Sequence, residues 1–142
     1  MANQALIEHI LNQRCFAVVG VSRDPEKYGY KVFKALKAAG MTTFAINPNA
    51  DQIDDDPCYP SLDNLPGDID VVVTVTPPDV TNEILPQAGR LNVPFCWMQE
   101  GSYNEASINL ARAHAMQLIA DGSCIMVAAA RHTAREVAQM RE

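Results

Sequence analysis

Phe16-Ala17-Val18-Val19-Gly20-Val21-Ser22 is the stretch that decides the fold. It predicts a strand that ends in a short glycine turn, and residues 28–39, after a polar loop, show the apolar period of an amphipathic helix. The first N–H groups of a helix lack partners within the helix and lie at its positive end. A strand, a tight turn and a helix start therefore form a cradle for phosphate, and we expect a nucleotide-type ligand here.

Length and composition describe one ordinary globular domain. The 142 residues, 48% hydrophobic and 20% charged, are enough for a single core, so we expect one domain over residues 1–142. No apolar run approaches the roughly 18 residues of a membrane helix. The N-terminus shows neither the basic region nor the apolar stretch of an export signal. We therefore expect a cytoplasmic protein without a membrane partner.

Charge and cysteine usage narrow the partners further. The net charge of −6 argues against nucleic acid, which is bound by neutralising many phosphates with Lys and Arg. Cys15, Cys58, Cys96 and Cys124 are spread singly, without a C-x-x-C pair, so neither a tetrahedral zinc site nor a redox dithiol is predicted. We expect the four thiols to be reduced and mostly buried.

Hydrophobic period alternates between strand and helix along the chain. Strands are predicted at residues 16–21, 42–46, 69–75, 93–98 and 117–120, with a short edge strand before Cys58. Right-handed crossovers between them give an α/β, Rossmann-like three-layer sandwich with a mainly parallel sheet in the order 3-2-1-4-5-6. Ligands bind such sheets at the carboxyl ends of the strands beside the switch point. We therefore expect Gly20-Val21-Ser22 and Thr76-Pro77-Pro78 to face each other across a crevice.

Capping patterns predict where the helices begin and end. Gly40 stops the helix over residues 28–39 in the manner of a C′ glycine. Thr76-Pro77-Pro78-Asp79 supplies a cap, prolines in the first turn and an acid at N3. Ser102-x-x-Glu105 and Thr133-x-x-Glu136 predict the starts of two later helices, and a first helix is expected around Leu6 to Leu11.

The turn after the first strand departs from a dinucleotide fingerprint. That fingerprint is G-x-G-x-x-G with an acid about 20 residues on for the ribose diol. This chain has Gly20-x-Ser22-x-x-Pro25, and Asn47 where the acid would stand, so a hydride-transfer enzyme is disfavoured. Gly20 also has a purely structural explanation, a tight turn that permits close packing of the helix.

Arg23, Lys27 and Lys31 lie in or just after this loop. Positive charge there opposes the helix dipole and is mildly unfavourable unless an anion arrives. We interpret Arg23 and Lys27 as ligand contacts. The alternative is that these are solvated cations on an exposed face, partly neutralised by Asp24 and Glu26, and Lys31 is equally well explained in that way.

Several short motifs occur in the order found in a known family. They are Gly20-Val21-Ser22, Lys27-Tyr28-Gly29, Asn47-Pro48-Asn49, Cys58-Tyr59-Pro60-Ser61-Leu62, Asp70-Val71-Val72-Val73, Trp97-Met98-Gln99-Glu100-Gly101 and Cys124. From about Arg14 to Val127 the chain resembles the small bacterial and archaeal proteins that bind coenzyme A (CoA). That family is similar to the CoA-binding domain of the succinyl-CoA synthetase α subunit standing alone.

The resemblance implies CoA or acyl-CoA as the ligand and a set of binding residues. Around the nucleotide and phosphates it places Gly20, Val21, Ser22, Arg23, Lys27 and Tyr28. Asn47, Pro48 and Asn49 would border the adenosine, Thr76, Pro77 and Pro78 would line the crevice, and Gln99, Glu100 and Gly101 would lie near the pantetheine path. Two departures concern the pantetheine end. Small family members often carry basic or aromatic residues where this chain has Thr76-Pro77-Pro78, and an acid and a histidine after Cys124, where this chain has Ala128-Ala129-Ala130-Arg131-His132.

No catalytic constellation emerges from the sequence. His9, His114 and His132 are interpreted as surface histidines, and Glu100 at a strand end is explained by a helix-entry turn as well as by acid or base chemistry. Cys124 is either a buried, inert thiol or, if the pantetheine sulfur approaches it, a partner in a mixed disulfide with CoA.

The predicted function is therefore a CoA-binding or acyl-CoA-binding module without catalysis: a carrier, a sensor or a regulatory partner. Its expected partners are the small-molecule ligand and, beyond that, a protein partner or further copies of the chain. The alternatives are a small enzyme acting on an acyl-CoA or a nicotinamide nucleotide, and a scaffold that keeps the fold without binding.

Overall fold

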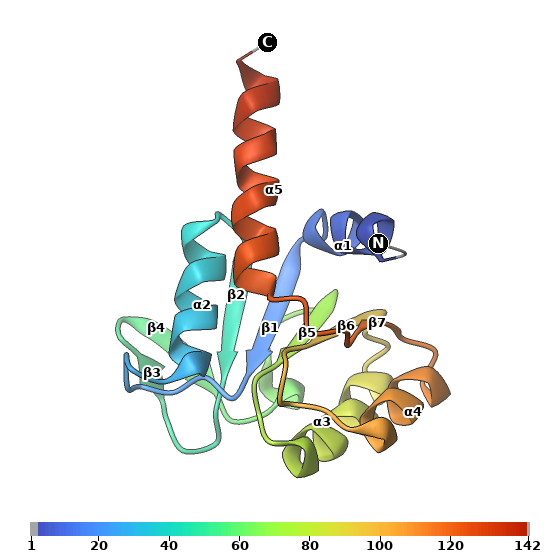
Figure 1. Cartoon of the computed structure of the whole chain (residues 1–142). Coiled ribbons are helices and arrows are strands. Elements are labelled where there is room, and N and C mark those ends of the chain that lie inside the picture. Colours follow the sequence, from blue (N-terminus) through green and yellow to red (C-terminus); the bar gives the residue numbers. More distant parts are fainter. Residues whose placement is uncertain (1–2, 142) are drawn as a thin grey trace.

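The structure, a computed structural model, describes residues 3–141 and has three layers, two of helices and a sheet between them (Figure 1). The strands are β1 (Cys15–Val19), β2 (Thr42–Ile46), β3 (Gln52–Ile53), β4 (Asp56–Tyr59), β5 (Val71–Thr74), β6 (Phe95–Met98) and β7 (Gln117–Ile119). The helices are α1 (Gln4–Leu11), α2 (Tyr28–Ala38), α3 (Pro78–Arg90), α4 (Glu105–Ala113) and α5 (Ile125–Met140), with a short 3-10 turn, η1 (Leu62–Asn64).

The sheet order confirms the Rossmann-like prediction. The strands run β3-β4-β2-β1-β5-β6-β7, and every pair is parallel except β3 with β4. Without the two-residue β3, this is the predicted order 3-2-1-4-5-6. β3 adds an antiparallel edge because the acidic segment after β2 turns back on itself before β4. The switch point lies between β1 and β5, as expected.

Two apolar cores lie on the two faces of the sheet, and alternate residues of each strand supply them. Phe16 and Val18 of β1 join the core under α1, α2 and α5, whereas Ala17 and Val19 join the core under α3 and α4. The central strand β5 divides its residues in the same way and is fully buried. Its continuously apolar sequence therefore reflects burial on both faces, as predicted.

The structure confirms the predicted end of α2 and corrects three helix starts. Gly40 follows α2 with φ of +87°, as a C′ glycine does. Pro77, not Thr76, is the N-cap of α3, because the Thr76 hydroxyl is bonded to Thr81 Oγ1 at 2.7 Å. Asp79 is consequently at N2 and not at the expected N3 position.

The capping box of α4 is shifted by two residues from the predicted one. Asn104 is the N-cap, its side chain accepts from the Ser107 N–H at 3.1 Å, and Ser107 Oγ accepts from the Asn104 N–H at 3.0 Å. Ser102 cannot serve as the cap, because its buried hydroxyl donates to the Gln99 carbonyl at 2.7 Å. A pattern of residue types alone could not reveal this competition.

α5 begins eight residues before the predicted cap at Thr133. Its first turns are anchored by Ile125 and Ala129, both buried in the core, so Thr133 is an internal residue of the helix. His132 is also buried, at 7% exposure, and its Nδ1 lies 3.2 Å from Glu8 Oε2 of α1. The prediction of a surface histidine was therefore wrong at this position, while His9 and His114 are exposed. The C-terminal part of α5 extends past the rest of the molecule (Figure 1).

The free cysteines are of two kinds. Cys58 and Cys96 are buried, whereas Cys15 and Cys124 are partly exposed.

Among residues 3–141, no helix combines the length and the apolar character that crossing a membrane requires.

Candidate functional site

Two glycines bring the start of α2 against the end of β1. Gly20 has φ of +100°, and a Cβ there would lie 2.9 Å from the side chain of Thr76. A Cβ on Gly29, in the first turn of α2, would lie only 2.1 Å from the carbonyl oxygen of Gly20. Neither position has room for a side chain. The close approach of loop and helix that the sequence predicted at this turn is therefore built into the backbone.

The loop before α2 carries two cations, Arg23 and Lys27, and two acids, Asp24 and Glu26, which offset them. Lys27 is the N-cap and has an extended backbone. Within residues 3–141, no side chain makes a capping hydrogen bond to the first N–H groups of α2, and the first turn of the helix contains no acid. Arg23 and Lys27 are exposed nearby. With its N–H groups and dipole uncompensated, this end of the helix favours an anion.

Asn47, at the end of β2, ties two loops together. Its Nδ2 donates to the carbonyl of Val21 at 2.7 Å, and its Oδ1 accepts from the Asn49 N–H at 2.8 Å, with Pro48 between the two asparagines. The side-chain amide is thus occupied in holding the Gly20 loop beside the turn after β2. A ribose diol would meet an engaged amide here, not the free carboxylate of a dinucleotide site.

A crevice of about 320 Å³ opens at the carboxyl edge of the sheet. Its lining consists of Tyr28, Val75, Thr76, Pro77, Pro78, Glu100, Gly101 and Ser102. Six predicted site residues therefore meet here, from the loops after β1, β5 and β6. Gly20 does not face Thr76 across the gap as expected, because the two residues are in direct contact. Tyr28 and the turn at Glu100 line the crevice together with Thr76-Pro77-Pro78.

Gln99 connects the crevice to Cys124. Gln99 is 1% exposed, its Oε1 accepts from the Ile125 N–H at 2.9 Å, and its Nε2 donates to the hydroxyl of Tyr28. The Tyr28 oxygen lies 3.5 Å from Cys124 Sγ, and Gln99 Nε2 lies 3.6 Å from the same sulfur. Because the Tyr28 oxygen accepts from Gln99, its proton is free to point at the sulfur.

This cluster changes the acidity of its members. Burial alone would raise the pKa of Cys124, but hydrogen bonds from Tyr28, Gln99 and the backbone at the start of α5 outweigh it, so the pKa lies below its usual value. Burial, together with the contact to Cys124, raises the pKa of Tyr28 to about 12. At neutral pH, Tyr28 is therefore a hydrogen-bond donor, and Cys124 has more thiolate character than an ordinary cysteine.

Other predicted residues lie outside the crevice. Arg23 borders a separate hollow of about 440 Å³ with Asp51, Gln52 and Asp54, beyond the loop. Asn47 is bonded to the Gly20 loop at Val21, which is fully buried, and Pro48 and Asn49 follow Asn47 in the turn after β2. These predictions of ligand contact remain predictions.

Sequence reasoning missed the contact between Tyr28 and Cys124. The two residues are 96 positions apart, and no short motif joins them. Trp97, which is fully buried, donates from Nε1 to the carbonyl of Ser123 at 3.0 Å and so holds the loop that carries Cys124. The available signal was the position of Gln99 directly after β6 and of Cys124 shortly after β7, because the carboxyl ends of these neighbouring parallel strands share one edge of the sheet.

The sheet order and the glycine contacts at the switch point define a Rossmann-like α/β domain. Within that class, the chain belongs to the family of CoA-binding domains, whose profile matches residues 14–130. It is similar to the acetate–CoA ligase (ADP-forming) II subunit alpha of Pyrococcus furiosus, with 32% identity over 62% of this chain and 20% of that protein. Uncharacterized protein YneT of Bacillus subtilis is 29% identical over 89% of this chain and 93% of its own length.

A solved structure shares both fold and sequence. A conserved hypothetical protein from Pyrococcus furiosus superimposes with a TM-score of 0.76 and 35% identity, over 81% of this chain and 98% of that one. The chain spans only 12% to 20% of the length of four acetate–CoA ligases that it matches. It corresponds to one domain of those ligases, and the small proteins match it nearly end to end.

Proposed function

We propose that the protein binds CoA or an acyl-CoA at the carboxyl edge of β1, β5 and β6, and that it acts as a carrier, sensor or regulatory module without catalysis. The observation that carries this proposal is the contact between Gly29 and the Gly20 carbonyl, which presses the uncapped start of α2 into the loop beside the crevice. Membership of the CoA-binding domain family supports the choice of ligand.

The proposed pose follows the charges and the crevice. The CoA phosphates would meet the N-terminal end of α2, with Arg23 and Lys27 nearby, since this end favours an anion. The pantetheine would run through the crevice between Pro77 and Tyr28 toward Gln99. The engaged amide of Asn47 supports CoA over a nicotinamide dinucleotide.

Native mass spectrometry of freshly purified protein tests the ligand, because a retained mass equal to that of CoA identifies the class directly. The same spectrum reports whether the chain assembles with further copies. Calorimetry with CoA, acetyl-CoA and NAD completes the test. We expect the first two to bind and NAD not to, and tight NAD binding without CoA binding would overturn the proposal.

An enzyme acting on acyl-CoA is the second candidate, and the lowered pKa of Cys124 beside the crevice is the observation in its favour. Following the thioester absorbance of acetyl-CoA with catalytic amounts of protein separates the two candidates. Multiple turnovers that disappear in Cys124→Ser would favour the enzyme. A constant thioester signal with binding intact supports the non-catalytic module, and an absence of any binding would favour the scaffold alternative.

A further inference from the structure

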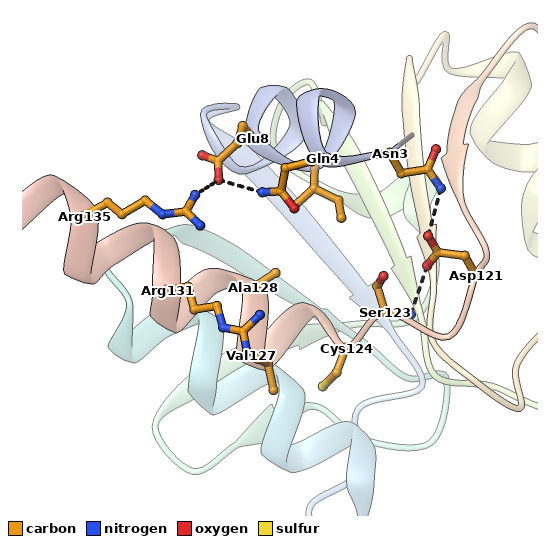
Figure 2. A pocket seen from close by; sticks show the side chains of 11 residues that line it. Asn3, Gln4, Glu8, Asp121, Ser123, Cys124, Val127, Ala128, Arg131 and Arg135 are labelled. Carbon is orange, nitrogen blue, oxygen red and sulfur yellow. Dashed lines mark hydrogen bonds and ion pairs between the residues drawn. The ribbon is translucent and has the colours of Figure 1, made fainter. Parts of the chain in front are cut away.

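Figure 2 shows a second hollow, which we call the α1–α5 hollow and which reaches the loop that carries Cys124. Its volume is about 290 Å³. One wall is α1, the opposite wall is the first half of α5, and the loop from Asp121 to Cys124 closes one end. Cys124 links the two sites, since it lines this hollow and its sulfur lies 3.5 Å from the hydroxyl oxygen of Tyr28, which lines the crevice.

The acids of the α1–α5 hollow are already paired. Glu8 is held by Arg135 and by His132, the latter at 3.2 Å. Asp121 accepts from Asn3 Nδ2 at 2.8 Å and from the Ser123 N–H at 2.9 Å. Glu8 therefore has its own cation in Arg135, whereas Asp121 accepts only from neutral groups and keeps its negative charge. Neither carboxylate is bonded to the additional positive charge of the hollow.

Arg131 supplies that additional charge. Among residues 3–141, no ion pair or side-chain hydrogen bond engages its guanidinium. Figure 2 shows the side chain directed along α5 toward Cys124, as helical side chains lean toward the N-terminus of their helix. The wall between Arg131 and Cys124 is apolar and consists of Val127 and Ala128, with Ile7 facing them from α1.

The α1–α5 hollow therefore has a thiol at one end, an apolar wall in the middle and an unpaired cation beyond. Arg131 is seven positions after Cys124, a rise of about 10 Å along a helix, and the arginine side chain reaches back over much of this distance. A short carbon chain that starts at the sulfur position and ends in a carboxylate matches this order of groups.

We propose that the α1–α5 hollow receives the acyl group of a CoA thioester whose far end carries a carboxylate, and that Arg131 pairs with that carboxylate. This inference rests on the proposed function, because it needs the pantetheine to pass Tyr28 and to end near Cys124. It adds the class of acyl group that the protein prefers. Arg131 and the whole of α1 lie outside residues 14–130, so the family match does not supply this feature.

Calorimetry with a matched pair of thioesters tests the proposal. Glutaryl-CoA and valeryl-CoA have acyl chains of the same carbon count, and only the first ends in a carboxylate. We expect glutaryl-CoA to bind wild type about three- to tenfold more tightly than valeryl-CoA, the scale of one partly exposed charge-assisted contact. Arg131→Gln should abolish that difference and leave the affinity for CoA unchanged. The control Arg112→Gln removes an exposed arginine of α4 and should alter none of these affinities.

Each contrary result has a distinct meaning. Equal affinity of wild type for the two thioesters, or equal weakening of CoA and both thioesters by Arg131→Gln, would overturn the carboxylate assignment while CoA binding stands. Free glutarate that binds as tightly as glutaryl-CoA, and depends equally on Arg131, would overturn the thioester assignment in favour of a free acid. Failure of every CoA compound to bind would instead refute the proposed function, and this inference with it.

Discussion

Gly29→Ala is the substitution that tests the architecture of the site most directly. The new Cβ would lie 2.1 Å from the Gly20 carbonyl oxygen. A Cβ atom essentially never lies within 3.0 Å of an atom that it is not bonded to, so the start of α2 must move by about 0.9 Å. Overpacking of this kind costs about 1–3 kcal/mol, and alanine returns at most about 1 kcal/mol of helix propensity. We expect a net loss of about 1–2 kcal/mol in the free energy of unfolding, measured by urea denaturation.

The same displacement moves the helix N–H groups away from a bound phosphate. A hydrogen bond of about 2.9 Å lengthened by this amount is lost, and one to a charged group is worth roughly 1.5–3 kcal/mol, so CoA affinity should fall at least about tenfold by calorimetry. Gly67→Ala is the matched control, since a Cβ there meets nothing within 4 Å, and it should change neither quantity. Wild-type stability and CoA affinity in Gly29→Ala would refute the close-contact argument.

Three further predictions concern ligand choice, charge and the thiol. CoA should raise the melting temperature and NAD should not, because Asn47 offers no free carboxylate to a ribose diol; a larger shift with NAD would reverse the assignment. Arg23→Ala combined with Lys27→Ala should weaken CoA binding by roughly 1–3 kcal/mol with the fold intact by circular dichroism; unchanged affinity would place the phosphates elsewhere. CoA disulfide should form a mixed disulfide at Cys124, its thiolate displacing CoA thiolate. Because the pKa of Cys124 is lowered, the reaction rate should rise with pH and level off at a lower pH than for a free cysteine. Tyr28→Phe removes a hydrogen bond to the sulfur, so it should raise the pKa of Cys124 and slow the reaction severalfold at pH 7. Peptide mapping that finds no label at Cys124 would contradict this prediction.

Local sequence was sufficient for the framework of the sheet. The positions of β1 and β5 could be predicted from their alternation and their β-branched residues. A strand that is covered on both faces of a parallel sheet must be apolar at successive positions, whatever its distant neighbours are. Gly20 and Gly40 marked chain turns for the same local reason, since both adopt positive φ. Right-handed crossovers then left essentially one economical strand order, which the structure has.

Helix starts were less predictable, because several residues compete for each capping role. Ser102 and Thr133 both fit a capping pattern, yet the Ser102 hydroxyl is used by the Gln99 carbonyl, and Thr133 lies within a helix that core packing begins earlier. A capping preference is worth about 1 kcal/mol, which is less than the free energy gained by burying a large apolar side chain, so burial decides where the helix begins.

The candidate site likewise has features that local sequence determines and features that only tertiary packing determines. By itself, the sequence determined the glycine turn, the presence of Arg23 and Lys27 in the loop after it, and the asparagine at position 47 where a dinucleotide site has an acid. All three are properties of neighbouring residues. Only the tertiary structure decided that Tyr28 contacts Cys124 and that Glu8 of α1 contacts His132 of α5. These pairs are separated by 96 and 124 positions, and the packing of whole helices on the sheet, which no local pattern encodes, sets their distances.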